Sequence, residues 1–396
     1  MNRKRKKYVE KYSILIALII IPLIPPEGLI VLMPHMYVLL YKMGKYISSI
    51  LILILFFEAL IHKRIKIFYT YGIIFLIFIW DLIITFIKGG DIKGCVGAFY
   101  SVLFLGILII SNTKKLKTIL NILFKYLMIL TLLNGVCMCF FPDGMYTSMG
   151  VEGYTANWLL GYKSSFQYYL LPLLCITYLK LVNSEEFVLC ILSIILVHGE
   201  TIASQNKMLL IGIAIVDMAI LNLYVLHWKR INAYITSIVA LLTNYILIFV
   251  PISNFQYIHY FITKVLKKDL TKGRIYLWKI TISWIKKSWV TGYGWVDSNI
   301  RYGMYRIVAH AHNQLLEFIF QGGIIQLTLY LILIFYVAYL LNKNYDFRSV
   351  TILIFSLFSL YIMTTVEIFT RGIGAGIWLL FILPESMQYI YVENDS

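Results

Sequence analysis

The sequence predicts an all-α, polytopic membrane protein with about twelve transmembrane helices and one large helical loop outside the membrane. Hydrophobic residues make up 60% of the 396 residues, mean hydropathy is +0.81, and only 14% of residues are charged. Soluble domains carry about 25% charged residues. Apolar runs of the length that crosses a hydrocarbon core recur along the whole chain. Because backbone groups must pair internally in lipid, these runs are expected to be helices.

The apolar runs define the elements in order. We expect membrane spans at 13–31, 46–61, 68–87, 95–111, 118–141, 166–182, 186–203, 207–226, 232–251, 314–341, 349–366 and 372–391. They divide the chain into helices 1–9 (residues 1–251), a loop (252–311) and helices 10–12 (312–396). Basic residues at 3–7 precede the first run, but no small-residue cleavage site follows it. A retained first helix is therefore expected instead of a signal peptide.

Lysine and arginine in short loops predict the orientation. With the N-terminus in the cytoplasm, the cytoplasmic segments hold 17 such residues and the short outer loops hold seven. This bias predicts a multi-pass protein of the cytoplasmic membrane with both termini inside. The five cysteines all fall within expected spans and predict no disulfide framework.

The loop 252–311 is the only long one, and this topology places it outside. It holds ten lysines and arginines against two aspartates, which is +8 of the net +16 of the chain. Two roles fit this charge, namely adhesion to anionic lipid headgroups or a pocket for a phosphorylated lipid substrate. Residues 273–289 show helical period, with Trp278, Ile282, Ile285 and Trp289 on one stripe. We expect a helix that lies at the membrane interface or packs against the protein.

The segment from His310 to Gly323, His-Ala-His-Asn-Gln-Leu-Leu-Glu-Phe-Ile-Phe-Gln-Gly-Gly, carries the densest polar chemistry. A neutral histidine suits proton acceptance from a hydroxyl group near pH 7. Asn313, Glu317 and Gln321 recur every four residues, so on a helix they share a face and could orient the hydroxyl groups of a ligand. A metal site and a simple helix cap are the alternatives for the histidine pair. No cysteine or aspartate cluster completes a metal site in this loop.

The order of motifs resembles the O-antigen ligase and polymerase superfamily of bacterial envelope glycosyltransferases. The resemblance rests on Gly273-Arg274 with Trp278 four residues later, the Gly292-x-Gly294 turn, and His312-Asn-Gln-x-Leu-Glu317 before the glycine pair. It implies transfer of a glycan from a polyprenyl diphosphate carrier to a sugar hydroxyl at the outer face, without metal, cofactor or nucleotide sugar.

The resemblance also implies roles for single residues. His312 falls on the family's essential histidine, and His310 is a second choice. Arg274 falls on the arginine of the external loop. The family's Ser-Arg motif is replaced here by Thr201-Ile-Ala-Ser-Gln-Asn-Lys207, so Lys207 is the nearest cation. Lysine offers a point charge where arginine offers a bidentate fork. Arg301 and Arg306 are further candidates to neutralise a diphosphate leaving group.

We interpret the chain as a polymerase that joins oligosaccharide repeat units carried on undecaprenyl diphosphate, for capsule, exopolysaccharide or O-antigen. An O-antigen ligase and a polysaccharide flippase or transporter are the alternatives. Partners implied by the resemblance are a flippase and a chain-length regulator, and no nucleic acid is expected. Asp81 lies inside an expected span, where ionisable residues are functional candidates, and we expect a structural or acceptor-site role.

Overall fold

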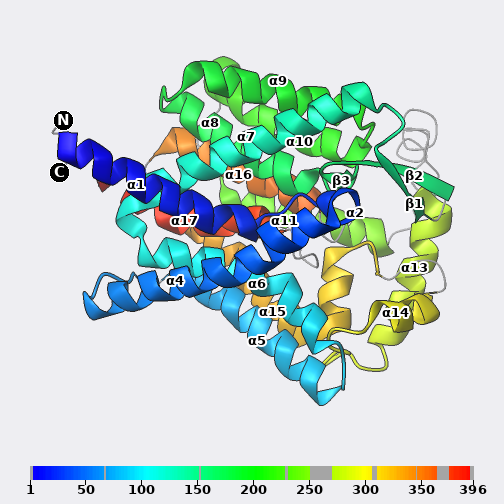
Figure 1. Cartoon of the computed structure of the whole chain (residues 1–396). Coiled ribbons are helices and arrows are strands. Elements are labelled where there is room, and N and C mark those ends of the chain that lie inside the picture. The colour runs from blue at the N-terminus through cyan, green and yellow to red at the C-terminus, as the bar shows by residue number, and fades with distance from the viewer. Residues whose placement is uncertain are drawn as a thin grey trace.

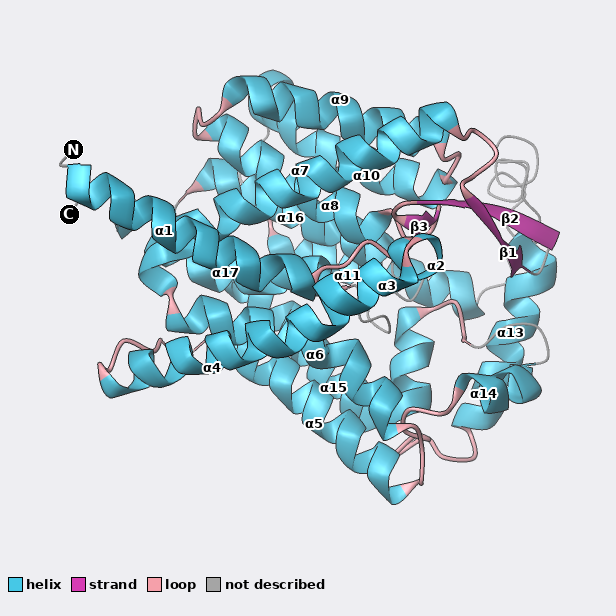
Figure 2. Cartoon of the chain, viewed as in Figure 1, coloured by secondary structure: helices cyan, strands magenta, loops and turns pink. Residues whose placement is uncertain are grey.

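The computed structural model describes residues 3–66, 68–150, 153–227, 231–249, 270–305, 310–344, 346–363 and 374–392. It describes only the backbone at 3–11, 149–150, 153–154, 270–275, 305 and 388–392. Figure 2 shows that the chain is built almost entirely of helices, with one small sheet.

The α-helices of the first half are α1 (Arg3–Ile20), α2 (Leu29–Leu32), α3 (Pro34–Met36), α4 (Gly44–Ile61), α5 (Tyr69–Ile87), α6 (Ile92–Ser111), α7 (Leu116–Phe140) and α8 (Gln167–Val182). The later ones are α9 (Phe187–Ala203), α10 (Lys207–Leu221), α11 (Ala233–Phe249), α13 (Leu270–Ile285), α14 (Ser298–Tyr305), α15 (Gln314–Lys343), α16 (Phe347–Met363) and α17 (Ala375–Val392). Short 3-10 or π segments extend four of them, at Ile21–Leu23, Tyr37–Met43, Thr113–Lys115 and Asn222–Leu226.

The predicted fold class is confirmed. Within the described ranges, six helices are long and apolar enough to cross a membrane, and six shorter helices are apolar as well. Each coincides with one expected span. The first span is shorter than expected, because helical structure ends at Leu23 before Pro25 and Pro26. Proline removes a backbone donor and restricts the residue before it, so the helix stops there.

The loops gather at two ends of the bundle (Figure 1). One end, which we call the sheet end, carries the strands together with α13 and α14. Backbone contacts join its loops, since Gly28 N–H donates to Leu159 O (2.9 Å) and Asp91 N–H donates to Trp295 O (2.7 Å). The opposite end carries both chain termini in Figure 1. This grouping is the one that twelve alternating spans require.

At the sheet end the segment after α7 folds as a three-stranded antiparallel sheet, which the sequence analysis did not predict. Its strands are β1 (Tyr146–Gly150), β2 (Gly153–Trp158) and β3 (Gly161–Tyr162), in the order β1-β2-β3. Tyr146 pairs with Asn157, and Trp158 pairs with Gly161. The Trp158 indole N–H donates to Phe141 O (2.7 Å), which ties the sheet to the end of α7.

Helices α8, α16 and α17 form the centre of the bundle. Most of their side chains are buried, including Tyr169, Leu353 and Trp378. By contrast α4 and α9 expose large apolar side chains such as Ile61 and Val188. Apolar side chains thus occupy both the interior of the bundle and its outer surface. This arrangement is expected when lipid surrounds the protein.

The external loop differs from the expectation in one respect. The predicted helix 273–289 is observed as α13, but it ends at Ile285, so Trp289 lies outside the apolar stripe. Trp278 is buried and Ile282 and Ile285 pack around it, whereas Trp289 is 58% exposed. The helix therefore packs against the protein, and its last predicted turn becomes part of a loop. Residues 251–269 lie outside the described ranges.

Candidate active site

Helix α15 breaks at Gly323, where the sequence predicted a continuous span. Gly323 has φ +67° and ψ −162°, so the helix consists of two segments. We call the short segment before the break (314–322) the outer segment and the long apolar one after it (324–343) the membrane segment. A Cβ atom at this position would collide with the Val290 carbonyl. Only glycine combines a positive φ with so close a backbone approach. The glycine pair thus ends the outer segment, and the long apolar helix begins after it.

The loop 289–294 satisfies the backbone groups that the break releases. Tyr293 N–H donates to Phe320 O (2.9 Å) and Gly294 N–H donates to Gln321 O (2.7 Å). In the reverse direction, Ile324 N–H donates to Trp289 O (2.9 Å). Gly292 and Gly294 both have φ +71°, which lets this turn lie flat against the break. The Gly-x-Gly turn and the glycine pair are therefore two halves of one contact.

Helix α5 holds the break from the other side. The Trp80 indole N–H donates to Gly322 O (2.7 Å). One turn further, the Thr85 hydroxyl donates to the Asp81 carbonyl (2.6 Å) and accepts from Trp295 N–H (2.8 Å). One helix thus positions both α15 and the loop that follows α13. The sequence analysis missed Trp80, Thr85 and Trp295. Nearness to Asp81 in the sequence could have marked the first two, and the position directly after the Gly-x-Gly turn could have marked Trp295.

The histidine loop precedes the outer segment of α15. Asn313 caps this helix, because its side-chain oxygen accepts from Leu315 N–H (3.0 Å) and Leu316 N–H (3.1 Å). His312 has φ +52°, a left-handed conformation that is uncommon outside glycine. The rings of His310 and His312 lie 4.2 Å apart between centroids, with planes at 64°. Both rings are half-buried, so they remain accessible to a substrate.

The loop is anchored by its buried residues. Ala311 is fully buried and packs with Trp278 of α13 and Leu316 of α15. The Asn313 amide also lies 3.4 Å from the side-chain oxygen of Asn244 in α11, whose own amide donates to Tyr361 O (3.1 Å). Three neighbouring helices therefore fix the position of the histidine pair, as a preorganised site requires.

The predicted polar face of Asn313, Glu317 and Gln321 exists, but it points into the protein. Glu317 is fully buried and accepts from the Arg301 guanidinium, from Ala311 N–H (3.1 Å) and from the Gln321 amide (3.1 Å). Arg301 is 7% exposed and lies over the ring of Phe320. A buried carboxylate needs such a partner, since an unpaired buried charge is costly. Glu317 thus joins α14 to the backbone of the histidine loop.

Asp81 lies below the break. Its carboxylate faces Gln326 of α15, and Glu317 and Arg301 act on it electrostatically. Both side chains are fully buried, and neither the carboxylate oxygens of Asp81 nor the amide of Gln326 is in hydrogen-bonding geometry with a described residue. Buried polar groups in this condition are rare in proteins. The pair extends the polar interior of the site from the outer segment of α15 into the span.

The remaining predicted residues stand further from this arrangement. Arg274 is part of α13, one turn before Trp278, and the structure describes only its backbone. Arg306 lies outside the described residues. Lys207 begins α10 at the sheet end, and α10 packs mainly on α16 and α8. The structure thus brings together His310, His312, Asn313, Glu317 and Arg301, while Lys207 starts a helix that packs elsewhere in the bundle.

Exposed cations lie on α13, which packs against the histidine loop, and directly after this helix. Lys279, Lys286 and Lys287 are exposed, and the Lys287 ammonium lies 4.4 Å from the ring centroid of Trp284. Burial raises the pKa of Tyr293, whose hydroxyl donates to the Trp284 carbonyl (3.0 Å). The described surface beside the histidines is therefore basic, and it suits an anionic substrate.

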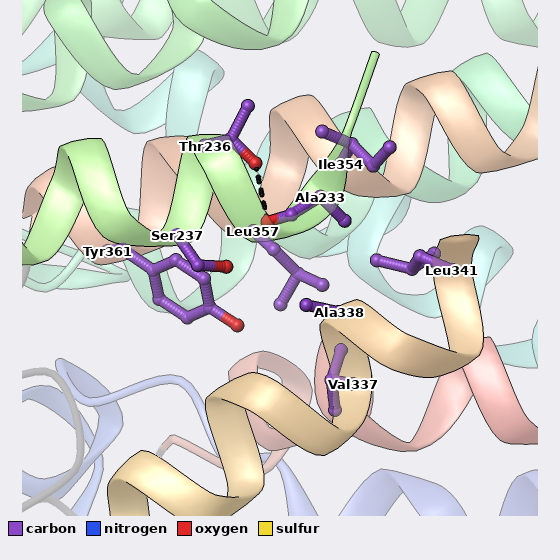
Figure 3. Close-up of a pocket in the computed structure, with 9 residues that line it drawn as sticks. All are labelled: Ala233, Thr236, Ser237, Val337, Ala338, Leu341, Ile354, Leu357 and Tyr361. Atoms are coloured by element: carbon purple, nitrogen blue, oxygen red, sulfur yellow. Dashed lines mark hydrogen bonds between the residues drawn. The ribbon is translucent and has the colours of Figure 1, made fainter. Parts of the chain in front are cut away.

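One other place in the structure is a poorer candidate. A cavity between α11, α15 and α16 has a volume of about 10 Å³, and Figure 3 shows its mostly apolar lining, with Ser237 and Tyr361 as the main polar groups. It has room for about one water molecule and none for a sugar. Across the described ranges, no group of three or more His, Cys, Asp and Glu side chains could hold a metal ion.

Comparison with known proteins identifies one region. Residues 187–331 match the family model described as O-Antigen ligase. No curated protein and no solved structure matches the chain. The matched region runs from α9 to the first turns of the membrane segment of α15. It contains every predicted site residue, including the histidine pair and Lys207.

Proposed function

Because residues 187–331 match the O-Antigen ligase family model, we propose that the protein is a glycan transferase and, more specifically, a polysaccharide polymerase. It joins oligosaccharide repeat units that are carried on undecaprenyl diphosphate, at the outer face of the cytoplasmic membrane. The histidine loop is the observation that supports the site, since two accessible imidazoles stand on a rigid frame beside a basic surface.

The chemistry assigns one role to each group. His312 accepts the proton of an acceptor sugar hydroxyl as its oxygen bonds to the anomeric carbon of the donor. The bond between that carbon and the phosphate oxygen breaks, and undecaprenyl diphosphate leaves with the electron pair. Cations stabilise the developing negative charge most strongly where water is excluded. Arg274, Arg306 and Lys207 take this role in the proposal, and His310 supports His312.

Arg301, Asn313 and Glu317 act differently in this proposal from the substrate ligands that the sequence predicted. Their side chains are buried and bonded to one another or to the histidine loop. They hold the loop in place, and sugar hydroxyls meet the half-buried histidine rings instead. The sheet end is the outer face, with both termini in the cytoplasm, as the bias of lysine and arginine predicts.

The test is His312→Ala in the native host, with the surface polysaccharide run on a gel. His35, an exposed histidine of α3, supplies the matched control His35→Ala. Loss of the long ladder, with single repeat units left on lipid and protein still in the membrane, supports a polymerase centred on His312. A normal ladder removes His312 from the mechanism. Loss of single lipid-linked repeats from the outer face indicates a flippase instead.

An O-antigen ligase is the second candidate, and the description of the matched family favours it. Both reactions use the same donor and differ in the acceptor. Purified protein given a lipid-linked donor distinguishes them. A polymerase lengthens glycans on undecaprenyl diphosphate when only lipid-linked repeats are present. A ligase forms product only after a second class of acceptor lipid is added.

A further inference from the structure

Three helices far from the histidine loop bring ionisable side chains together. Tyr178 of α8 donates its hydroxyl to one carboxylate oxygen of Asp217 in α10 (2.5 Å). His198 of α9 places its Nε2 2.9 Å from the other oxygen, and its Nδ1 lies 2.8 Å from the Ile194 carbonyl. The proposed glycan transfer uses none of these residues.

The His198–Asp217 pair lies within the length of two apolar helices. Asp217 is ten residues into the span Lys207–Leu226, and His198 is five residues before the end of α9 at Ala203. At 1.5 Å per residue these positions are about 15 Å and about 8 Å from the sheet end, inside a hydrocarbon core of about 30 Å. Charged side chains at this depth are rare and almost always face the bundle interior or a water-filled cavity.

Here the pair faces outward. Side-chain exposure is 35% for His198 and 36% for Asp217. Helix α9 packs on α7 and α8, and α10 packs mainly on α16, so α9 and α10 touch each other only lightly. The pair bridges this light contact, and the buried Tyr178 bonds to it from the interior. We call the face that α9 and α10 expose around the pair the groove. Figure 1 shows α9 at the edge of the bundle, where lipid or another protein reaches it.

The hydrogen bonds of the pair show which donors are already used and which acceptors remain. If the imidazole carries two protons, one goes to Ile194 O and one to the Asp217 carboxylate. If the aspartate carries a proton, it goes to Nε2, and the proton on Nδ1 goes to Ile194 O. In both arrangements every donor hydrogen is used, while lone pairs of the carboxylate remain. The outward side of the pair therefore accepts hydrogen bonds.

The surface around the pair accommodates a helix. Gly199 follows His198 on the exposed face of α9, and a Cβ atom there would meet nothing within 4 Å. Ile195 and Ile202, on the same face, are 62% and 66% exposed. A small residue between large apolar ones lets a second helix backbone come close, which is how helices associate in membranes.

We propose that this groove binds a transmembrane helix of another protein, one that presents a hydrogen-bond donor side chain within the hydrocarbon core. Lipid acyl chains have no donor at this depth. A second copy of the chain would bring the same patch in a two-fold contact. Among the described residues of α9 and α10, the exposed side chains around the pair are apolar, namely Ile195, Ile202, Leu210 and Ala214. A two-fold contact through this face therefore supplies no donor, and the proposal assigns the donor to a different chain.

The experiment measures energy transfer between the labelled full-length protein and a synthetic transmembrane peptide in phosphatidylcholine vesicles. One peptide is a leucine-alanine helix with a central glutamine, and its match has leucine there. We expect the glutamine peptide to associate about threefold to tenfold more tightly, the range of one interhelical hydrogen bond in a membrane. Gly199→Phe fills the groove without touching the pair and should abolish the difference.

The control is Gly97→Phe on α6, another exposed glycine with open space around it. His198→Leu combined with Asp217→Leu should also abolish the preference, since it removes the acceptor. Equal association of both peptides with the wild type overturns the proposal, as does an equal effect of Gly199→Phe and Gly97→Phe. Energy transfer between two labelled copies, lost with Gly199→Phe alone, would assign the groove to a second copy instead.

Discussion

Removal of one member of the Arg301–Glu317 pair should be far more damaging than removal of both. In Glu317→Leu the Arg301 guanidinium, 7% exposed, loses its carboxylate, and Ala311 N–H loses its acceptor. Leaving a buried charge without its partner costs about 3–5 kcal/mol. A difference of this size is roughly a hundredfold to several-thousandfold in an equilibrium constant. The histidine loop should therefore detach from α14 and α15.

Arg301→Leu should be damaging for the same reason, because it strands the fully buried carboxylate of Glu317. The double variant Arg301→Leu/Glu317→Leu removes both charges and leaves apolar side chains of similar volume. Replacement of whole buried pairs is often neutral or stabilising. We expect thermal unfolding in detergent to show two destabilised single variants and a double variant that recovers most of the loss, because only the unpaired Ala311 N–H, at about 1–3 kcal/mol, still separates it from the wild type.

The matched control is Lys279→Leu, which removes an exposed cation from α13 and should leave the melting temperature unchanged. The reasoning is refuted if either single variant is as stable as the wild type, or if the double variant is the least stable of the set. The glycan ladder of the double variant measures, in addition, whether Arg301 is needed for polymer formation. A stable double variant that makes no polymer would return Arg301 to the substrate, as the sequence analysis had it.

Three further predictions concern the glycine break, Asp81 and a salt-bridge cluster at the terminus end. Gly323→Ala should cut polymer formation at least about tenfold, because a Cβ meets the Val290 carbonyl at a positive φ, whereas Gly303→Ala, in open space on α14, should be silent on the same gel. Asp81→Asn should keep the ladder, since an amide can face the Gln326 amide, while Asp81→Leu should raise stability by about 1–3 kcal/mol in denaturant unfolding, because it removes a buried carboxyl group that is in no hydrogen-bonding geometry with a described residue. Burial raises the pKa of Glu185, but hydrogen bonds from Lys117 and Lys180 outweigh this and hold it below its usual value. That stabilisation is full above the unfolded pKa and lost as pH falls through the folded one, so Glu185→Gln should lower the melting temperature at pH 7 and have a vanishing effect well below pH 4.5. A constant difference at every pH would contradict this assignment.

The membrane spans could be predicted because the bilayer sets one length for all of them, and apolar runs of that length are visible in the chain. The break at Gly323 could not, since residues 314–341 read as one apolar helix apart from a few polar side chains. The groups that stabilise the break come from Trp80 and from the loop 289–294, which only tertiary structure brings near. The end of α13 at Ile285 depends on the same loop, which takes Trp289 out of the helix.

In the candidate site, too, some features could be predicted from the sequence and others depend on tertiary structure. The motif around His312 was evident from residue types alone, because titratable groups stand out beside an apolar run. Arg301 was assigned to the diphosphate as a cation of the basic loop, and Glu317 to sugar hydroxyls as part of a helix face, although the two bond to each other. Sequence spacing cannot distinguish a carboxylate that faces outward from one that faces a neighbouring helix. Gln326 passed unnoticed because one amide inside a span carries no pattern.

The contact between Asp81 and Gln326 also bears on how the protein is made. Helix α5 is synthesised 245 residues before Gln326 leaves the ribosome, as the two positions show. At about 5–20 residues per second this interval is of the order of tens of seconds. During that time the carboxyl group of α5 has no Gln326 amide to face. The contact between α5 and α15 therefore forms late in synthesis, when, of the described helices, only α16 and α17 are still to follow.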